Sequence, residues 1–122
     1  MAFTFADFTP FAALTGDVEK WSMPAKAMIM GAVIKTSVAF AGAGITGLTL
    51  SVGIVGNLAK VLSPFDAKAA VSNTNFATAQ TLDLEDFGAA TSIRLAAVAI
   101  GANLSNLTAG AGCLYLLGAK IP

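Results

Sequence analysis

The amino-acid sequence predicts an all-β protein, an antiparallel β-sandwich or jelly roll with one long irregular excursion. Apolar residues alternate with period two in several separate runs, as expected for strands that place one face on a core. Glycine, asparagine or proline separates these runs, and about seven or eight strands at intervals of roughly 8–12 residues are typical of sandwiches. We therefore expect residues 1–122 to form a single β-sandwich domain with little helix.

The longest alternating stretch covers residues 28–53. Two apolar runs of strand character lie on either side of a break of small residues, Ala41 to Gly44. Two glycines in that break suit a tight turn, because glycine adopts positive φ without steric cost. We therefore predict a long antiparallel hairpin whose Phe40 and Leu50 face the same core.

The first 16 residues are rich in phenylalanine. Phe3 and Phe5 share a strand parity and Pro10 ends the run, which predicts a short edge strand. Four phenylalanines are too many for a free tail, so this segment docks either on its own core or, as an N-terminal arm, on a neighbouring subunit. The candidate interface residues are the aromatic ones near this end of the chain: Phe3, Phe5, Phe8, Phe11 and Trp21.

Shorter strands are expected around the hairpin. Residues 18–23 alternate up to Pro24, and residues 54–62 continue as a strand or make one helical turn. Residues 91–101 alternate again. Turn residues then dominate 102–112, and residues 113–121 form the last strand.

Residues 65–88 form the irregular excursion, with a short helix expected over 65–71. Asp83, Glu85 and Asp86 are the one acidic cluster, and carboxylates can hold a hard cation. Because the run lacks the spaced ligands of a calcium loop, we interpret it as a solvated face and predict no metal site. Long loops on a rigid scaffold usually carry contacts, so the excursion faces either a partner or solvent.

Enzymatic chemistry has little to draw on. The chain has no histidine, which excludes Ser-His-Asp and Cys-His arrangements and the common zinc sites. Residues 42–47 match G-x-G-x-x-G, but no acidic residue lies about 20 positions on and no helix follows, so these glycines belong to the turn. We predict no catalytic residues and no cofactor. Basic residues are few and unclustered, which argues against nucleic-acid binding.

Composition points instead to contact with other proteins. Apolar residues make up 56% of the chain and charged residues only 11%, against about 25% charged in typical soluble domains. A lone monomer of this size has too little interior to hide so much apolar surface. We therefore expect a homo-oligomer, bound to a larger protein assembly.

A membrane protein is the alternative. Residues 36–59 and 95–119 contain no charged residue, and each run exceeds the ~20 residues that span a bilayer as a helix. Glycines interrupt both runs, and Asn103 and Asn106 lie in the middle of the second, where polar amides are costly in hydrocarbon. A small two-helix integral membrane protein is accordingly the alternative hypothesis for the function. A carbohydrate-binding sandwich is a third, disfavoured because one Trp and one Tyr give few stacking surfaces.

Four segments follow a common layout: a proline-led entry at 23–30, a strand at 33–40 that ends in Ala39-Phe40, a strand at 48–53 that closes on Val-Gly, and a final hairpin at 107–116. In this layout the chain resembles small bacteriophage virion proteins. Acidic residues usually follow the Val-Gly in those proteins, whereas Ile54 to Asn57 follow it here. The resemblance implies a capsid cement or decoration protein of the virion, a trimer that binds a larger capsid protein and carries no catalytic residues.

Overall fold

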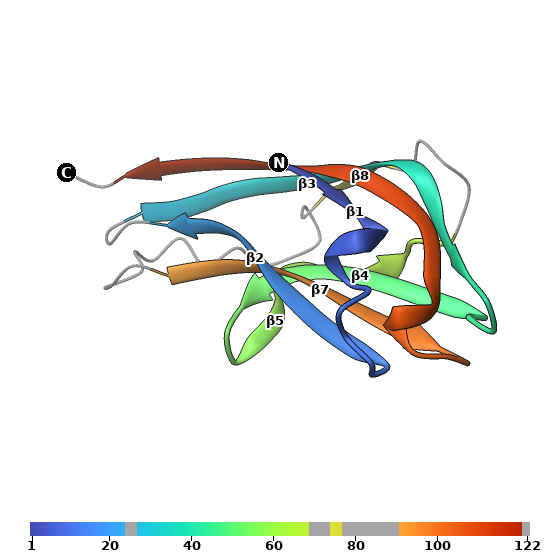
Figure 1. Cartoon of the computed structure of the whole chain (residues 1–122). Helices are drawn as coiled ribbons and strands as arrows, with labels where there is room; N and C mark the ends of the chain where they lie inside the picture. Colours follow the sequence, from blue (N-terminus) through green and yellow to red (C-terminus); the bar gives the residue numbers. More distant parts are fainter. Residues whose placement is uncertain (24–26, 69–73, 77–90, 121–122) are drawn as a thin grey trace.

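The computed structural model describes residues 1–23, 27–68, 74–76 and 91–120 of the chain. Within these residues the strands are β1 (Ala2–Thr4), β2 (Thr15–Met23), β3 (Ala27–Gly42), β4 (Gly47–Ile54), β5 (Asn57–Asp66), β6 (Thr74–Phe76), β7 (Thr91–Ile100) and β8 (Leu107–Lys120). They form two four-stranded antiparallel sheets that lie face to face (Figure 1). Sheet A has the order β1-β8-β3-β6 and sheet B the order β2-β7-β4-β5. The predicted all-β sandwich is confirmed.

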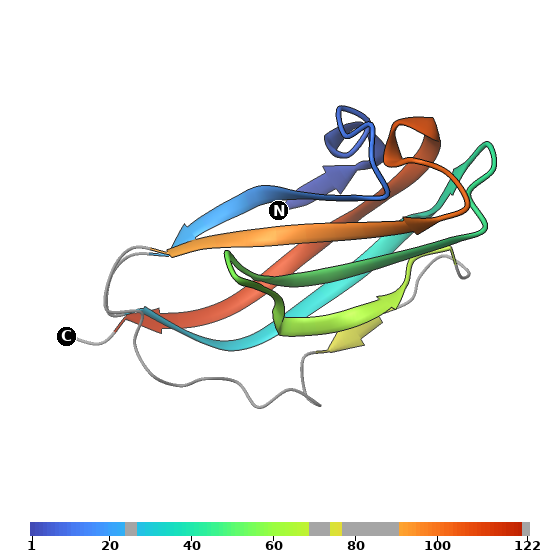
Figure 2. The same ribbon diagram turned by 90° about the horizontal axis from the view of Figure 1, so that it is seen from below.

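The strand pairs are nested. β1 pairs with β8, β2 with β7, β3 with β6 and β4 with β5, while the β3–β8 and β4–β7 pairs complete the two sheets. This is the arrangement of one long hairpin wrapped onto itself, which defines a jelly roll. Seen from below, β8 and β3 cross behind β7 and β4 at an angle (Figure 2), as expected for two twisted sheets.

The predicted hairpin over residues 28–53 is wrong in its pairing. Both strands exist, as β3 and β4, but they belong to different sheets. Between them the turn is closed by the Ile45 N–H, which donates to the Gly42 carbonyl at 3.2 Å, and Gly44 has φ of 78°. Alternation shows that a strand has one face on a core, and two strands on opposite sides of that core satisfy it equally well.

Several boundaries also differ from the predictions. β2 begins earlier than expected, at Thr15, and β8 begins at Leu107. The helix predicted over 65–71 is wrong at its start, because β5 continues through Pro64 to Asp66; residues 69–71 lie outside the described residues. β5 tolerates the proline because it is an edge strand, where one backbone N–H need not be paired.

The charge-free runs that suggested membrane helices are strands, β3 with β4 and β7 with β8. In the part of the chain that the structure describes, no helix is long and apolar enough to cross a bilayer. Only two short 3-10 turns are described, η1 (Phe5–Asp7) and η3 (Leu104–Asn106).

The core lies between the sheets. The predicted alternation fails at Val38, which shares its parity with Phe40 but is 46% exposed, because register shifts interrupt β3 on both sides of it. Phe40 and Leu50 both lie in the core, as the sequence predicts, one from each sheet. The largest fully buried side chains come from both sheets and from the turns: Phe3, Phe8, Phe40, Ile34, Leu48, Leu50, Ile93, Leu95, Leu104, Leu114 and Val52. Burial of these groups is the main source of stability.

One polar group in this core supports a stability prediction. The Thr36 side chain is 2% exposed, and among the described residues its hydroxyl has no hydrogen-bond partner. An unpaired buried hydroxyl costs about 1–3 kcal/mol. We expect Thr36→Val, which keeps the shape of the side chain, to raise the free energy of unfolding by about 1–2 kcal/mol in urea denaturation. Thr49→Val, on the half-buried outer side of β4, is the control and should change it little. A loss of stability in Thr36→Val would show that the hydroxyl is paired.

Candidate interaction surface

The N-terminal aromatic residues pack on the chain's own core. Phe3 and Phe8 are almost completely buried, and Phe5 and Phe11 are half-buried against the core cluster. Phe11 lies over Gly16, where a Cβ would overlap its ring. Of the two alternatives predicted for the N-terminal segment, the structure shows the first: the segment packs on the core of its own chain. The rings of Phe3 and Phe8 are therefore enclosed within the chain, whereas Phe5 and Phe11 keep part of their surface outside.

Trp21 is the fifth candidate interface residue, and it lies apart from the other four. It stands opposite Ile93 in the β2–β7 pair, directly after a register shift that begins at Glu19. Its side chain is 49% exposed, so a large apolar surface remains available there. Its role in an interface stays a prediction.

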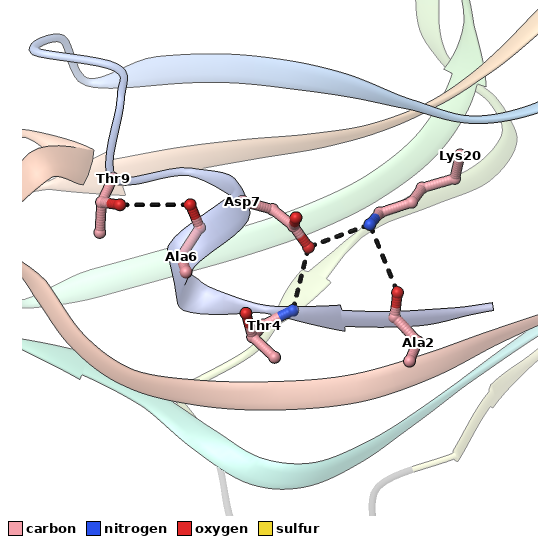
Figure 3. A network of polar contacts seen from close by, with 6 residues as sticks. All are labelled: Ala2, Thr4, Ala6, Asp7, Thr9 and Lys20. Atoms are coloured by element: carbon pink, nitrogen blue, oxygen red, sulfur yellow. Dashed lines mark hydrogen bonds and ion pairs between the residues drawn. The ribbon is translucent and has the colours of Figure 1, made fainter.

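A polar network closes the outer edge of β1 (Figure 3). The Leu114 N–H donates to the Met1 carbonyl at 2.8 Å, so the next residue, Ala2, directs its backbone groups away from β8. The Lys20 ammonium donates to the Ala2 carbonyl at 3.3 Å and forms an ion pair with Asp7 at 3.0 Å. The Thr4 N–H donates to the same Asp7 carboxylate at 3.0 Å. Side chains thus bind two outward backbone groups of β1, the Ala2 carbonyl and the Thr4 N–H.

Removing this network should lower the free energy of unfolding by a small but measurable amount. The Lys20 and Asp7 side chains are 16% and 33% exposed, so solvent screens their attraction. We expect a coupling energy of about 0.5–1 kcal/mol between Lys20→Met and Asp7→Ala in a double-mutant cycle. Thermal denaturation of the four proteins measures it, and Glu19→Ala on exposed β2 serves as the charge control. Additive effects would show that the two side chains do not interact.

The outer face of sheet B is charged at one end. Arg94 on β7 forms an ion pair with Asp17 on β2 and donates to the Asp17 carbonyl at 3.2 Å. Another nitrogen of the guanidinium donates to the Ser92 hydroxyl at 3.3 Å. The opposite position to Arg94 on β2 is the exposed Glu19. Opposite charges therefore neutralise each other across the two strands.

The other end of the same face is apolar and uncharged. Val98 and Ile100 follow Arg94 at strand spacing on β7 and are 43% and 61% exposed. Thr15 and Thr49 stand opposite Val98 on the two neighbouring strands, and Gly47 stands opposite Ile100. We call these five residues the β7 patch. Its small flanking residues leave both apolar side chains accessible, as at many protein contact sites.

The outer face of sheet A is more mixed. Tyr115 and Lys35 are exposed there, and Cys113, half-buried, stands opposite both Lys35 and Ala2. Burial raises the pKa of the Cys113 thiol, but hydrogen bonds with Tyr115 and the Met1 amino group lower it to below its ordinary value. The bond with Cys113 in turn raises the pKa of the Tyr115 hydroxyl.

Metal chemistry has no visible site in the described ranges. Among residues 1–23, 27–68, 74–76 and 91–120, no three His, Cys, Asp or Glu side chains lie close enough to hold an ion. The acidic cluster of Asp83, Glu85 and Asp86 lies outside the described residues. Of the three glycines interpreted as turn residues, Gly44 lies in the turn between β3 and β4, and Gly42 and Gly47 are the strand residues on either side of that turn.

The sequence contained a signal for the β7 patch, which was missed because the candidate interface residues were chosen for being aromatic. One parity of the strand begins with Ser92 and Arg94 and ends with Val98 and Ile100, so one face changes from polar to apolar along its length. No charged residue follows Arg94 before Lys120. The comparisons with known proteins add no further indication, since no family model, curated protein or solved structure matches the chain.

Proposed function

We propose that this protein is a structural subunit of a bacteriophage virion, a cement or decoration protein that binds the outside of a capsid shell. The observation that carries the proposal is the β7 patch, an uncharged surface with two exposed apolar side chains at one end of a sheet face whose other end is charged. The virion class itself rests on the sequence resemblance described above.

Two further features support the proposal. Nested strand pairing of this kind occurs in viral capsid domains, although also in lectins and cupins, so the fold alone does not decide function. Low charge suits a protein whose work is contact: only 11% of the residues are charged. The proposed mechanism is mechanical, with apolar burial of ~25 cal/mol per Å² holding the subunit on the shell.

The β7 patch gives the proposal a specific test on virus particles. Particles purified from the organism that encodes the chain should contain the protein in many copies, detected by mass spectrometry and by antibody labelling of the capsid surface. Particles stripped of it should rebind the purified protein. Ile100→Lys, made together with Val98→Lys, should reduce rebinding at least tenfold, because two charges would be desolvated in the contact.

Val55→Lys is the matched control. Val55 is 72% exposed and lies in the turn between β4 and β5, outside the patch. This variant should rebind like the unchanged protein, and circular dichroism should show the same fold for all three. Particles that lack the protein would refute the virion role, and equal rebinding of all variants would refute the role of the patch.

A further inference from the structure

Among the described residues, part of β8 has no strand beside it on one edge, which we call its open edge. β3 pairs with β8 as far as Lys120, whereas on the other side the pairing with β1 ends where the Leu114 N–H donates to Met1. Backbone groups alternate in direction along a strand, so those of Leu116, Gly118 and Lys120 point to the same side as those of Leu114. No described residue pairs with them there, and Figure 1 shows β8 running on past β1 toward the C-terminus.

Other edges with defined pairing carry features that discourage strand addition. On β1, Lys20 binds the outward Ala2 carbonyl and Asp7 binds the outward Thr4 N–H (Figure 3). β2 carries charged residues and a register shift after Glu19, and β5 carries Pro64 and two register shifts against β4. Charges, prolines and bulges are the devices by which natural edges avoid pairing. On the far side of sheet A, the defined contacts of β3 are those with β6 and the bond from the Phe40 N–H to Ala67.

We propose that the open edge of β8 binds the β8 strand of a second copy of this chain, antiparallel and related by a two-fold axis at Gly118. Gly118 then pairs with Gly118 of the second copy, and Leu116 pairs with Lys120 of the second copy. The two four-stranded sheets A join into one continuous sheet across the dimer.

The register follows from the backbone geometry. In a two-fold antiparallel pair, hydrogen bonds form only between residues whose backbone groups point outward, here Leu116, Gly118 and Lys120. An axis at Leu117 would place Lys120 of the second copy opposite Leu114, whose N–H is already bound to Met1. An axis at Lys120 would place two lysines opposite each other, which is destabilising. The axis at Gly118 uses all three outward residues and avoids both conflicts.

A second copy is the occupant that the described residues favour. Each copy brings the same open edge, so both sets of backbone groups are satisfied in one step. In the Gly118 register the two Lys120 residues lie at opposite ends of the pairing, so no like charges meet. The glycine on the axis brings no side chain to the centre of the contact. This pairing makes a dimer in place of the trimer that the sequence resemblance implies, and it does not depend on the proposed virion role.

Cysteine crosslinking tests the register. Leu117 and Ala119 of the second copy would stand opposite each other as a non-hydrogen-bonded pair, with Cα atoms about 4.5 Å apart, within the range of a disulfide. In a Cys113→Ser background, Leu117→Cys alone and Ala119→Cys alone should each stay uncrosslinked under mild oxidation. An equimolar mixture of the two should form a covalent dimer. Equal crosslinking of the single variants, or none in the mixture, would overturn the proposal.

Proline substitution tests the edge itself. The Gly118 N–H points away from β3, so Gly118→Pro removes both hydrogen bonds of the central pair, one from each copy, and leaves the β3–β8 pairing intact. Light scattering should show the unchanged protein at twice 12.3 kDa and Gly118→Pro at 12.3 kDa, with the same far-ultraviolet circular dichroism. Leu117→Pro is the matched control, because its N–H points toward β3 and its loss should disturb the fold. A monomer or a trimer of the unchanged protein would overturn the pairing.

The virion role and the β8 edge pairing can each be refuted without affecting the other. Lysines at Val98 and Ile100 lie on the outer face of sheet B and should leave the dimer mass unchanged. Gly118→Pro lies in sheet A and should leave rebinding to particles unchanged. A Gly118→Pro protein that is still a dimer contradicts the edge pairing without affecting the virion role.

Discussion

Phe40→Ala is expected to lower the free energy of unfolding by about 3–5 kcal/mol, the usual cost of removing a buried aromatic ring. The Phe40 side chain is 1% exposed. Its ring stacks on Phe3 with centroids 6.1 Å apart and meets the edge of Phe8 at 6.3 Å. Removal therefore leaves a cavity at the point where β1, β3 and η1 meet, and urea denaturation followed by fluorescence of Trp21 measures the loss.

Val38→Ala is the control for this experiment. Val38 lies on the same strand two residues before Phe40, but it is 46% exposed. Its truncation should cost less than about 1 kcal/mol, because little buried surface is lost. Equal losses in the two variants would show that Phe40 does not lie in the core.

Gly101→Ala is expected to be nearly as damaging. Gly101 has φ of 94°, and a Cβ there would overlap the carbonyl oxygen of Gly44 in the β3–β4 turn. Positive φ costs an alanine about 1–2 kcal/mol. The overlap adds about 1–3 kcal/mol, because the obstacle is backbone and cannot move aside cheaply. Thermal or urea denaturation should thus show a loss of about 2–5 kcal/mol.

Gly56→Ala separates these two contributions. Gly56 has nearly the same φ, 91°, but no atom lies within 4 Å of its added Cβ. This variant should lose only the conformational part, about 1–2 kcal/mol. If both variants lose the same amount, the contact between Gly101 and Gly44 does not limit the packing of the two turns.

The sequence determined the strands better than their partners. Alternation located the runs that became β3, β4 and β7, and it identified Phe40 and Leu50 as core residues. It could not tell that β3 and β4 lie in different sheets, because a strand on either side of a core shows the same pattern. The helix expected after Pro64 failed for a related reason: proline interrupts a central strand but not an edge, and edge position is decided by distant partners.

The candidate interface residues illustrate a similar limit. Aromatic residues near a chain end fit an arm as well as a docked strand, and only the pairing of Phe3 with Gly112 on β8 distinguishes them. By contrast, the β7 patch depends on which parity of the strand faces outward. The open edge of β8 depends on where β1 ends, and neither property can be read from local sequence.

The nested pairing also bears on how the chain reaches this structure. Of the six strand pairs among the described residues, only β4–β5 joins strands that are adjacent in sequence, while Ala2 must find Cys113 near the other end of the chain. Such distant contacts carry a large loop-closure entropy before they contribute any stability, so folding in milliseconds to seconds is expected. β8 is the inner strand between β1 and β3, and sheet A stays divided until it inserts. During synthesis on the ribosome, the rings of Phe3 and Phe40 would therefore stay unburied, and accessible to chaperones, until the residues of β8 emerge.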